Sequence, residues 1–225
     1  MAQQTKCRKK TEARREGILD AALEEFAAKG YAGARMEDIA RRAGVAKGTL
    51  YLHFGDKEGL FNGLAESAFA PMHALAKAAG VYGMVGGQVI DLESEGRAID
   101  IDLLRILQEG KTAALIAAAC EVGCIIGGGG ARQVAAAQRY GIHIGLCFQM
   151  IDDILDVTST SEELGKPVGS DASNEKTTYV SLLGLDEVRR LAQEHTDAAV
   201  SALKTFKRDT ADLRLLADRL LARSL

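Results

Sequence analysis

Apolar side chains recur at helical spacing near the start of the chain. Ile18, Ala22 and Phe26 lie four residues apart, so they fall on one face of a helix. This spacing predicts a helix over residues 12–29, which Gly30 ends because glycine adopts the backbone conformation that terminates helices. The first element is therefore expected to be amphipathic, with its apolar face buried.

The next thirty residues predict two short helices joined by a tight turn. Apolar positions give a helix over residues 36–43 and another over residues 46–54, with Gly44 between them. Asp56 is placed to cap a fourth helix that begins at Lys57. Two short helices around a tight turn form a helix-turn-helix, whose second helix enters the DNA major groove.

The remainder of the chain continues the helical pattern, and Pro71 permits a kink or a restart of the fourth helix. Apolar periodicity predicts helices near residues 77–93, 100–126, 131–157, 178–206 and 210–223. Four glycines at residues 127–130 predict a flexible joint. Strand-like alternation is missing from the sequence, so the expected fold is all-α.

Composition places the boundary between two domains and narrows the classes of protein. The sequence becomes rich in Gly and Ala from about residue 77, which predicts domains at 1–65 and 79–225 joined by a junction at 66–78. No apolar run approaches the ~20 residues of a membrane-spanning helix. The four cysteines have neither zinc-ligand spacing nor the density of a disulfide scaffold, which predicts a cytoplasmic protein.

Charge is distributed unevenly between the two halves. Residues 1–60 carry 12 Lys and Arg against 9 Asp and Glu, whereas the remainder carries 16 against 22. Six basic residues cluster before and at the start of the first helix: Lys6, Arg8, Lys9, Lys10, Arg14 and Arg15. A basic arm beside a helix-turn-helix is typical of a protein that contacts DNA phosphates.

The helix-turn-helix segment MEDIARRAGVAKGTLYLHFGDKEGL resembles the DNA-binding domain of TetR-family repressors, and the resemblance covers about residues 11–64. It implies a homodimer on a palindromic operator. The side chains expected to meet DNA are those of Lys47, Gly48, Thr49, Tyr51 and His53 in the major groove and Lys57 at a phosphate. Arg35 and Ala46 depart from the family, since each stands where a Ser or Thr usually caps the helix that follows.

A cluster of carboxylates marks the second half. Asp152, Asp153 and Asp156 fall with Gln149 on one side of the helix at 131–157, and Ile151 falls on the opposite side, which we expect to be the buried one. Three carboxylates this close repel one another unless a cation neutralises them. Mg²⁺ takes oxygen ligands and bridges to phosphate, so the cluster is either a Mg²⁺–phosphate site or the acidic, solvated end of a helix.

Five motifs in order give this cluster a context. They are GMVGGQVIDL, EGKTAALI, FQMIDDILD, GKPVGSD and KTTYVSLLG, and together they resemble the C-terminal half of trans-isoprenyl diphosphate synthases. The resemblance, which covers about residues 77–225, makes Asp152, Asp153 and Asp156 the second aspartate-rich motif that holds Mg²⁺. It also implies that five further side chains bind the diphosphate: Lys111, Thr112, Gln149, Lys166 and Lys176.

A second DDxxD motif is missing from this sequence, and the helix-turn-helix stands where the synthases carry their first one. In that family two facing aspartate-rich motifs hold the Mg²⁺ ions that stabilise the leaving diphosphate. We therefore expect no catalytic residues and no catalysis by this chain alone. The sequence predicts a TetR-type transcriptional regulator with a truncated isoprenoid-synthase-like domain that binds a Mg²⁺–prenyl diphosphate. The alternatives are an isoprenyl diphosphate synthase subunit or fragment, and a chimera without coupling between its halves.

Overall fold

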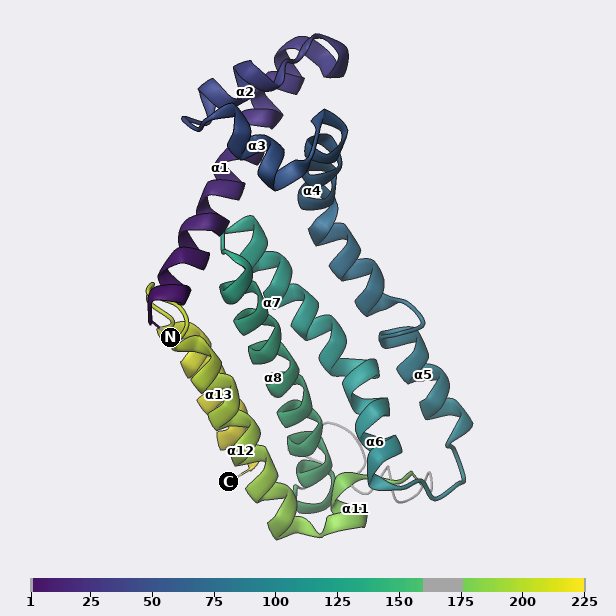
Figure 1. The fold of residues 1–225 in the computed structure, drawn as a ribbon. Helices are drawn as coiled ribbons and strands as arrows, with labels where there is room; N and C mark the ends of the chain where they lie inside the picture. The colour runs from purple at the N-terminus through teal and green to yellow at the C-terminus, as the bar shows by residue number, and fades with distance from the viewer. Residues whose placement is uncertain (1, 160–175, 225) are drawn as a thin grey trace. The chain divides into compact units, whose positions relative to one another are not determined.

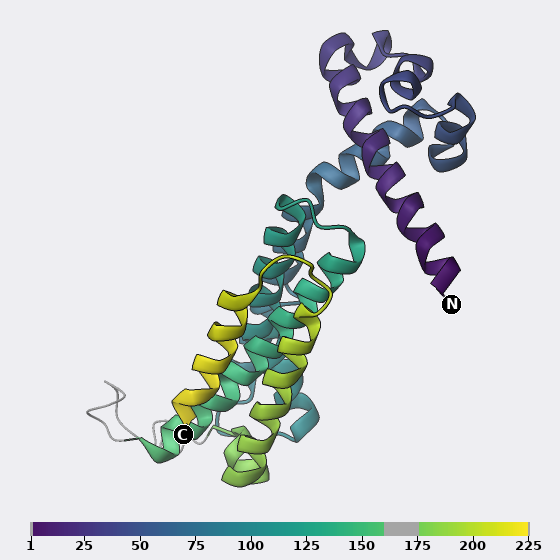
Figure 2. The ribbon, with the colours of Figure 1, turned by 90° about the vertical axis from the view of Figure 1, so that its left-hand side faces the viewer.

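The computed structural model describes residues 2–159 and 176–224, and the side chains of residues 14–159 and 176–223. Every regular element in these ranges is helical, as the sequence predicts. The chain divides into two compact units, Met1–Ala70 and Pro71–Leu225. The helices of each unit can be followed in Figure 1 and, turned by 90°, in Figure 2.

The first unit contains α1, α2, α3 and the beginning of α4. Their bounds are Ala2–Gly33, Met36–Arg42, Lys47–Phe54 and Lys57–Ala79. The helix α1 begins ten residues earlier than we expected, because the basic segment before residue 12 is rich in residues that favour helices. Gly30 interrupts α1 with a φ of 67°, close to the predicted end.

The core of the first unit is formed by the faces that the spacing predicts. Ile18, Ala22 and Leu50 are 0 % exposed, and Phe26 is 8 % exposed. Gly44 adopts a φ of 65° between α2 and α3, a conformation that side chains other than glycine disfavour. Leu50 therefore anchors α3 in the core, while the tight turn at Gly44 sets the direction in which α3 leaves α2.

Helix caps in this unit also follow the sequence. The backbone N–H of Gly59 donates to the Asp56 side chain over 2.7 Å, so Asp56 caps α4. Arg35 and Ala46 stand at the N-caps of α2 and α3, and neither provides a side-chain hydrogen bond. The two helices of the helix-turn-helix thus begin without the capping that Ser or Thr would supply.

The second unit holds the remaining helices. They are α5 (Met84–Glu93), α6 (Ile101–Gln108), the π-helical turn η1 (Glu109–Ala113), α7 (Ala114–Ile126), α8 (Ala131–Thr158), α11 (Tyr179–Leu183), α12 (Leu185–Leu203), α13 (Ala211–Leu221) and the 3₁₀ turn η2 (Ala222–Ser224).

Three sequence predictions in this unit are corrected by these bounds. The helix α4 continues through Pro71, and the helical structure is interrupted instead between Ala79 and Met84. The expected helix at 100–126 is interrupted by the π-helical turn η1. The expected helix at 178–206 is divided into α11 and α12 at Gly184, whose φ is 81°.

The helix α8 is the centre of the second unit and lies between α7 and α12 (Figure 1). Its side chains supply much of the core, including Tyr140, Cys147, Ile151 and Ile154. The Tyr140 hydroxyl donates to the Leu213 carbonyl over 2.8 Å, which ties α8 to α13. The helices described in this structure include none that is both long and apolar enough to cross a bilayer.

Candidate functional site

The exposed face of α3 carries the residues that the sequence assigns to DNA. Lys47, Gly48 and Tyr51 are exposed, whereas Thr49 and His53 are half-buried. The Lys47 ammonium lies 5.7 Å from the centroid of the Tyr51 ring, within range of a cation–π contact. The helix therefore presents a cationic and aromatic surface, while its Leu50 side chain is buried in the core.

An acidic residue of α2, Glu37, forms an ion pair with Lys47. This hydrogen bond lowers the pKa of the Glu37 carboxyl and raises the pKa of the Lys47 ammonium. Sequence reasoning missed this residue, because spacing along the chain does not show that the exposed faces of α2 and α3 meet.

Lys57 at the start of α4 has neighbours that the sequence did not suggest. Its ammonium donates to the carbonyl of Ala34 over 2.9 Å and to that of Ala32 over 3.3 Å. It also lies 4.7 Å from the centroid of the Tyr31 ring. Since an ammonium has three donors, two carbonyls leave one hydrogen of Lys57 for a further acceptor.

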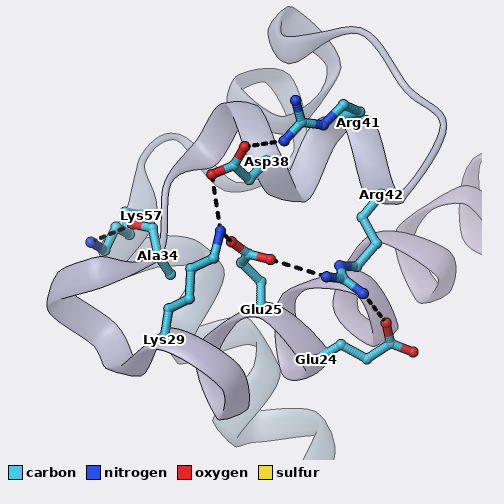
Figure 3. A network of polar contacts seen from close by, with 8 residues as sticks. All are labelled: Glu24, Glu25, Lys29, Ala34, Asp38, Arg41, Arg42 and Lys57. Carbon is cyan, nitrogen blue, oxygen red and sulfur yellow. Dashed lines mark hydrogen bonds and ion pairs between the residues drawn. The ribbon is translucent and has the colours of Figure 1, made fainter.

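A network of charged side chains joins α1 to α2 (Figure 3). At its centre is Glu25, which is 1 % exposed and pairs with Lys29 and, over 3.3 Å, with Arg42. The network continues through Lys29 to Asp38, a distance of 3.3 Å, and Lys29 holds the pKa of the Asp38 carboxyl below its usual value. Glu25 and Lys29 lie on α1 while Arg42 and Asp38 lie on α2, so these ion pairs connect the two helices.

The basic arm is part of α1. Of its six residues, Arg14 and Arg15 have described side chains, both exposed, whereas Lys6, Arg8, Lys9 and Lys10 lie outside the described side chains. The Arg15 guanidinium lies 5.3 Å from the centroid of the Phe54 ring, at the end of α3. This arginine therefore supports the end of α3 through a cation–π contact.

In the second unit, residues from four segments surround a small cavity of about 120 Å³. The segments are α5 with the connection that follows it, α6 with η1, α8, and residues 176–178. Among the lining residues are five that the sequence assigned to the diphosphate or the metal: Lys111, Gln149, Asp152, Asp153 and Lys176. Side chains far apart in the sequence are thus brought to one place.

Asp91 on α5 connects the two lysines of this cavity. Its Oδ2 accepts from Lys111 Nζ over 2.7 Å and from Lys176 Nζ over 3.4 Å. Burial raises the pKa of the Asp91 carboxyl, but the two ammonium groups outweigh this effect and leave the pKa below its usual value. Sequence reasoning gave Asp91 no role, although it lies within the GMVGGQVIDL motif.

A close crossing of backbones positions Lys111. A Cβ atom added at Gly87 on α5 would lie 2.7 Å from the Cα of Lys111 and 2.8 Å from the carbonyl carbon of Gly110. Only glycine therefore permits α5 to approach η1 this closely. The π-helical turn that carries Lys111 is an element often found at functional sites.

We expected the three aspartates of α8 to lie on an exposed face, but the structure places them on a largely buried one. Asp153 and Asp156 are buried, at 6 % and 2 % exposed, while Asp152 is half-buried. The backbone N–H of Tyr179 donates to Asp153 Oδ2 over 2.7 Å, so the beginning of α11 covers this part of α8. The prediction that only the opposite side of the helix is buried was wrong, because periodicity cannot reveal a segment that folds back from 26 residues away.

The donor set of the cavity suits a hard cation. Carboxylate oxygens of Asp152 and Asp153 and the amide oxygen of Gln149 are the ligand types that Mg²⁺ prefers. Within the described residues, however, no group of three His, Cys, Asp or Glu side chains is arranged to hold a metal by itself. A metal here would therefore need oxygens from a bound ligand to complete its coordination.

Three of the residues that the sequence assigned to the diphosphate or the metal are not among those lining the cavity. Thr112 and Asp156 are absent from the residues that line the cavity. Lys166 falls in the segment 160–175, outside the described residues. The cavity instead includes Thr177 and Thr178 of the KTTYVSLLG motif, whose hydroxyls the sequence analysis did not single out.

Family models match both parts of the chain. The model for polyprenyl synthetases matches residues 64–214, and the model for bacterial regulatory proteins of the tetR family matches residues 18–64. The farnesyl diphosphate synthase of Geobacillus stearothermophilus is 40% identical over 149 residues, which are 66% of this chain and 50% of that protein. The farnesyl diphosphate synthase of Escherichia coli (strain K12) is 41% identical over 67% of this chain and 52% of its own length. The chain thus spans about half the length of these relatives.

Solved structures agree with the sequence matches. The decaprenyl diphosphate synthase of Rhodobacter capsulatus is 27% identical, with a TM-score of 0.59 over 95% of this chain and 78% of its own. The polyprenyl synthase of Caulobacter crescentus CB15, solved with calcium and isoprenyl diphosphate, shares the fold at 24% identity, with a TM-score of 0.62 over 95% of this chain and 77% of its own. The chain therefore belongs to the polyprenyl synthetase family over residues 64–214 and carries a domain matched by the tetR-family model at residues 18–64.

Proposed function

We propose that this protein is a TetR-type transcriptional regulator whose polyprenyl-synthetase unit binds a prenyl diphosphate together with Mg²⁺. The observation that carries the regulatory part is the exposed Lys47–Tyr51 face of α3, within the segment matched by the tetR-family model. The observation that carries the ligand part is the convergence of Lys111, Lys176 and Asp152 on one cavity. The proposed place of action is the cytoplasm.

The DNA-binding surface is α3 with the start of α4. In this proposal Lys47, Thr49, Tyr51 and His53 read base edges in the major groove, and exposed Gly48 allows the close approach of the backbone. Lys57 uses its remaining hydrogen for a phosphate. One helix-turn-helix reads a single half-site, so the protein acts as a homodimer on a palindromic operator.

The ligand surface uses the cavity of the second unit. In this proposal Asp152 and Asp153 would hold Mg²⁺ at the cavity, with Asp156 buried beside them and ligand oxygens completing the coordination. The ion would neutralise these carboxylates and so allow a diphosphate to bind. Lys111 and Lys176 bind the diphosphate oxygens, which replace the Asp91 carboxylate as their partner, and Gln149 and Thr112 orient it by hydrogen bonds. Lys166 is assigned to the same role.

The single DDxxD motif limits the chemistry of this site. With one aspartate-rich cluster the charge that develops on a leaving diphosphate is only half neutralised, so we propose no catalysis by this chain. The rival function is an isoprenyl diphosphate synthase subunit or fragment, or a chimera, and the identity of about 40% to farnesyl diphosphate synthases favours the transferase class if the protein is an enzyme.

Selection from random duplex DNA, with and without farnesyl diphosphate plus Mg²⁺, tests the regulatory function. We expect a palindromic sequence to be enriched, with an altered affinity when the ligand is present. A Lys47→Ala/Tyr51→Ala variant should lose both affinity and selectivity. A Tyr82→Ala/Lys207→Ala variant removes the same side-chain types from exposed positions of the second unit and should behave as wild type.

Thermal unfolding with Mg²⁺ and farnesyl diphosphate tests the ligand site. Ligand should raise the melting temperature only when Mg²⁺ is present, by an amount that grows with the logarithm of its excess over Kd. Asp152→Asn should abolish this rise, whereas Asp212→Asn, at an exposed position of α13, should preserve it. A rise of equal size in EDTA would contradict the proposed role of the metal.

A further inference from the structure

The ion pair between Glu37 and Lys47 links the two helices of the helix-turn-helix on their exposed side. Glu37 lies in the first turn of α2, and Lys47 is the first residue of α3. Their side chains are 58 % and 50 % exposed, so both remain in contact with solvent. The pair therefore lies on the surface that the proposed function assigns to DNA.

Tyr51 completes this exposed cluster. The Lys47 ammonium lies 5.7 Å from the centroid of the Tyr51 ring, one helical turn further along α3. Lys47 is thus held from two directions, by a carboxylate and by an aromatic face. A lysine with these partners occupies a restricted position, whereas an unpaired lysine samples many rotamers.

The same pair changes the charge that DNA meets. A free lysine releases about one counterion when it contacts a phosphate, which strengthens binding to any duplex alike. Lys47 has its charge matched by Glu37, so a phosphate gains little by approaching it. The Glu37 carboxylate would also be left facing the phosphate, and like charges at short range are unfavourable.

A contact of Lys47 with a base edge differs from a contact with a phosphate, because the acceptors on the base carry no net charge. The carbonyl oxygen and a ring nitrogen of guanine are uncharged acceptors exposed in the major groove, and lysine binds these two atoms with defined geometry. An uncharged acceptor does not repel Glu37, so Lys47 can bind it while remaining close to the carboxylate. The ion pair therefore penalises phosphate contacts more than base contacts.

We propose that Glu37 is a specificity-determining residue, which suppresses sequence-independent DNA binding by pairing with Lys47 beside Tyr51. This inference rests on the proposed DNA-binding function. It differs from the assignment of α3 as the reading helix, because it places a determinant of selectivity on α2.

The test compares Glu37→Gln, Lys47→Gln and the double variant with wild type, each on the selected operator and on a scrambled duplex over a range of salt. We expect Glu37→Gln to bind scrambled duplex more tightly at low salt and to steepen the dependence of log K on log[salt] by about 0.9. Its ratio of operator to scrambled affinity should fall. The double variant should lose the added salt dependence, because the gain acts through Lys47.

Glu24→Gln provides the matched control. It removes one exposed negative charge from the same unit, while Arg42, its partner at 2.7 Å, keeps its contact with Glu25. If Glu37→Gln and Glu24→Gln have equal effects, the change is one of net charge and the inference is wrong. A loss of operator affinity in Glu37→Gln without a gain on scrambled duplex would overturn it as well. Absence of duplex binding by the wild type would instead overturn the proposed function itself.

Discussion

At the scale of single residues, Ala46 begins α3 without a side chain that accepts a hydrogen bond from the first turn. Ala46→Ser supplies that acceptor, and we expect it to raise the free energy of unfolding of the first unit by about 1 kcal/mol. Denaturant titration followed by far-UV circular dichroism measures the change. Ala28→Ser, at an exposed interior position of α1, is the matched control and should be slightly destabilising, because serine has the lower helix propensity. Equal effects of the two variants would contradict the capping argument.

Lys57 carries a second prediction at this scale. Lys57→Ala removes the hydrogen bonds to the Ala32 and Ala34 carbonyls, so the first unit should lose about 1 kcal/mol of stability. In the proposed function it also removes one phosphate contact, which should weaken binding to all sequences alike and flatten the salt slope by about one. A stability loss with an unchanged salt slope would assign Lys57 a structural role alone.

At the scale of secondary-structure elements, the crossing of α5 and η1 decides whether Asp91 and Lys111 meet. A methyl group at Gly87 would collide with the η1 backbone, so Gly87→Ala should cost roughly 1–3 kcal/mol and abolish Mg²⁺-dependent diphosphate binding. Gly123→Ala in α7 is the control, because a Cβ there meets no atom within 4 Å. It should stabilise the second unit by roughly 0.5–1 kcal/mol, since alanine is the better helix former. Calorimetric unfolding and diphosphate titration of both variants decide between a packing constraint and a general intolerance of substitution.

The contact between α8 and α12 carries a prediction about pH. His143 Nδ1 and His195 Nδ1 are 2.9 Å apart, so one ring donates and the other accepts. Burial, with His143 and Arg105 nearby, lowers the pKa of His195 to about 4; burial, with Arg105 and Arg139, also lowers the pKa of His143. Both pKa values lie below those of an unfolded chain, so the unfolded state takes up protons first as the pH falls. The contribution of these two histidines to the stability of the second unit is therefore fully present above about pH 6.5 and decreases as the pH falls toward 4.

Replacement of one ring tests this dependence. His195→Gln keeps a hydrogen-bonding side chain without a titrating group, and its melting temperature should fall less between pH 6.5 and pH 4 than that of wild type. The exposed His73→Gln serves as the control and should retain the wild-type dependence. Identical pH profiles for His195→Gln and wild type would show that the pair does not contribute.

At the scale of the whole molecule, the prediction concerns turnover. The chain has one aspartate-rich motif, so the negative charge of the departing diphosphate would be only partly neutralised. The purified protein should therefore not elongate prenyl diphosphates from isopentenyl and dimethylallyl substrates. Release of diphosphate from these substrates is the measurement. Steady release that disappears in Asp152→Ala would contradict the proposal and assign the protein to the transferases.

The sequence by itself determined the elements and the identity of both parts. Helical spacing located the buried faces of α1 and α3, Gly44 marked the turn, Asp56 marked a cap, and ordered motifs indicated both families. These features depend on neighbours within one or two helical turns, or on short motifs, and such information is present in the order of residues.

The tertiary structure alone decided which side chains meet. Three sets of contacts join residues from different segments. They are the ion pair of Glu37 with Lys47, the ion pairs of Asp91 with Lys111 and Lys176, and the hydrogen bond that covers Asp153. Periodicity assigned Asp153 and Asp156 to an exposed face because it describes one helix in isolation. Burial and pairing are set by what packs against that helix, and a one-dimensional pattern does not contain this information.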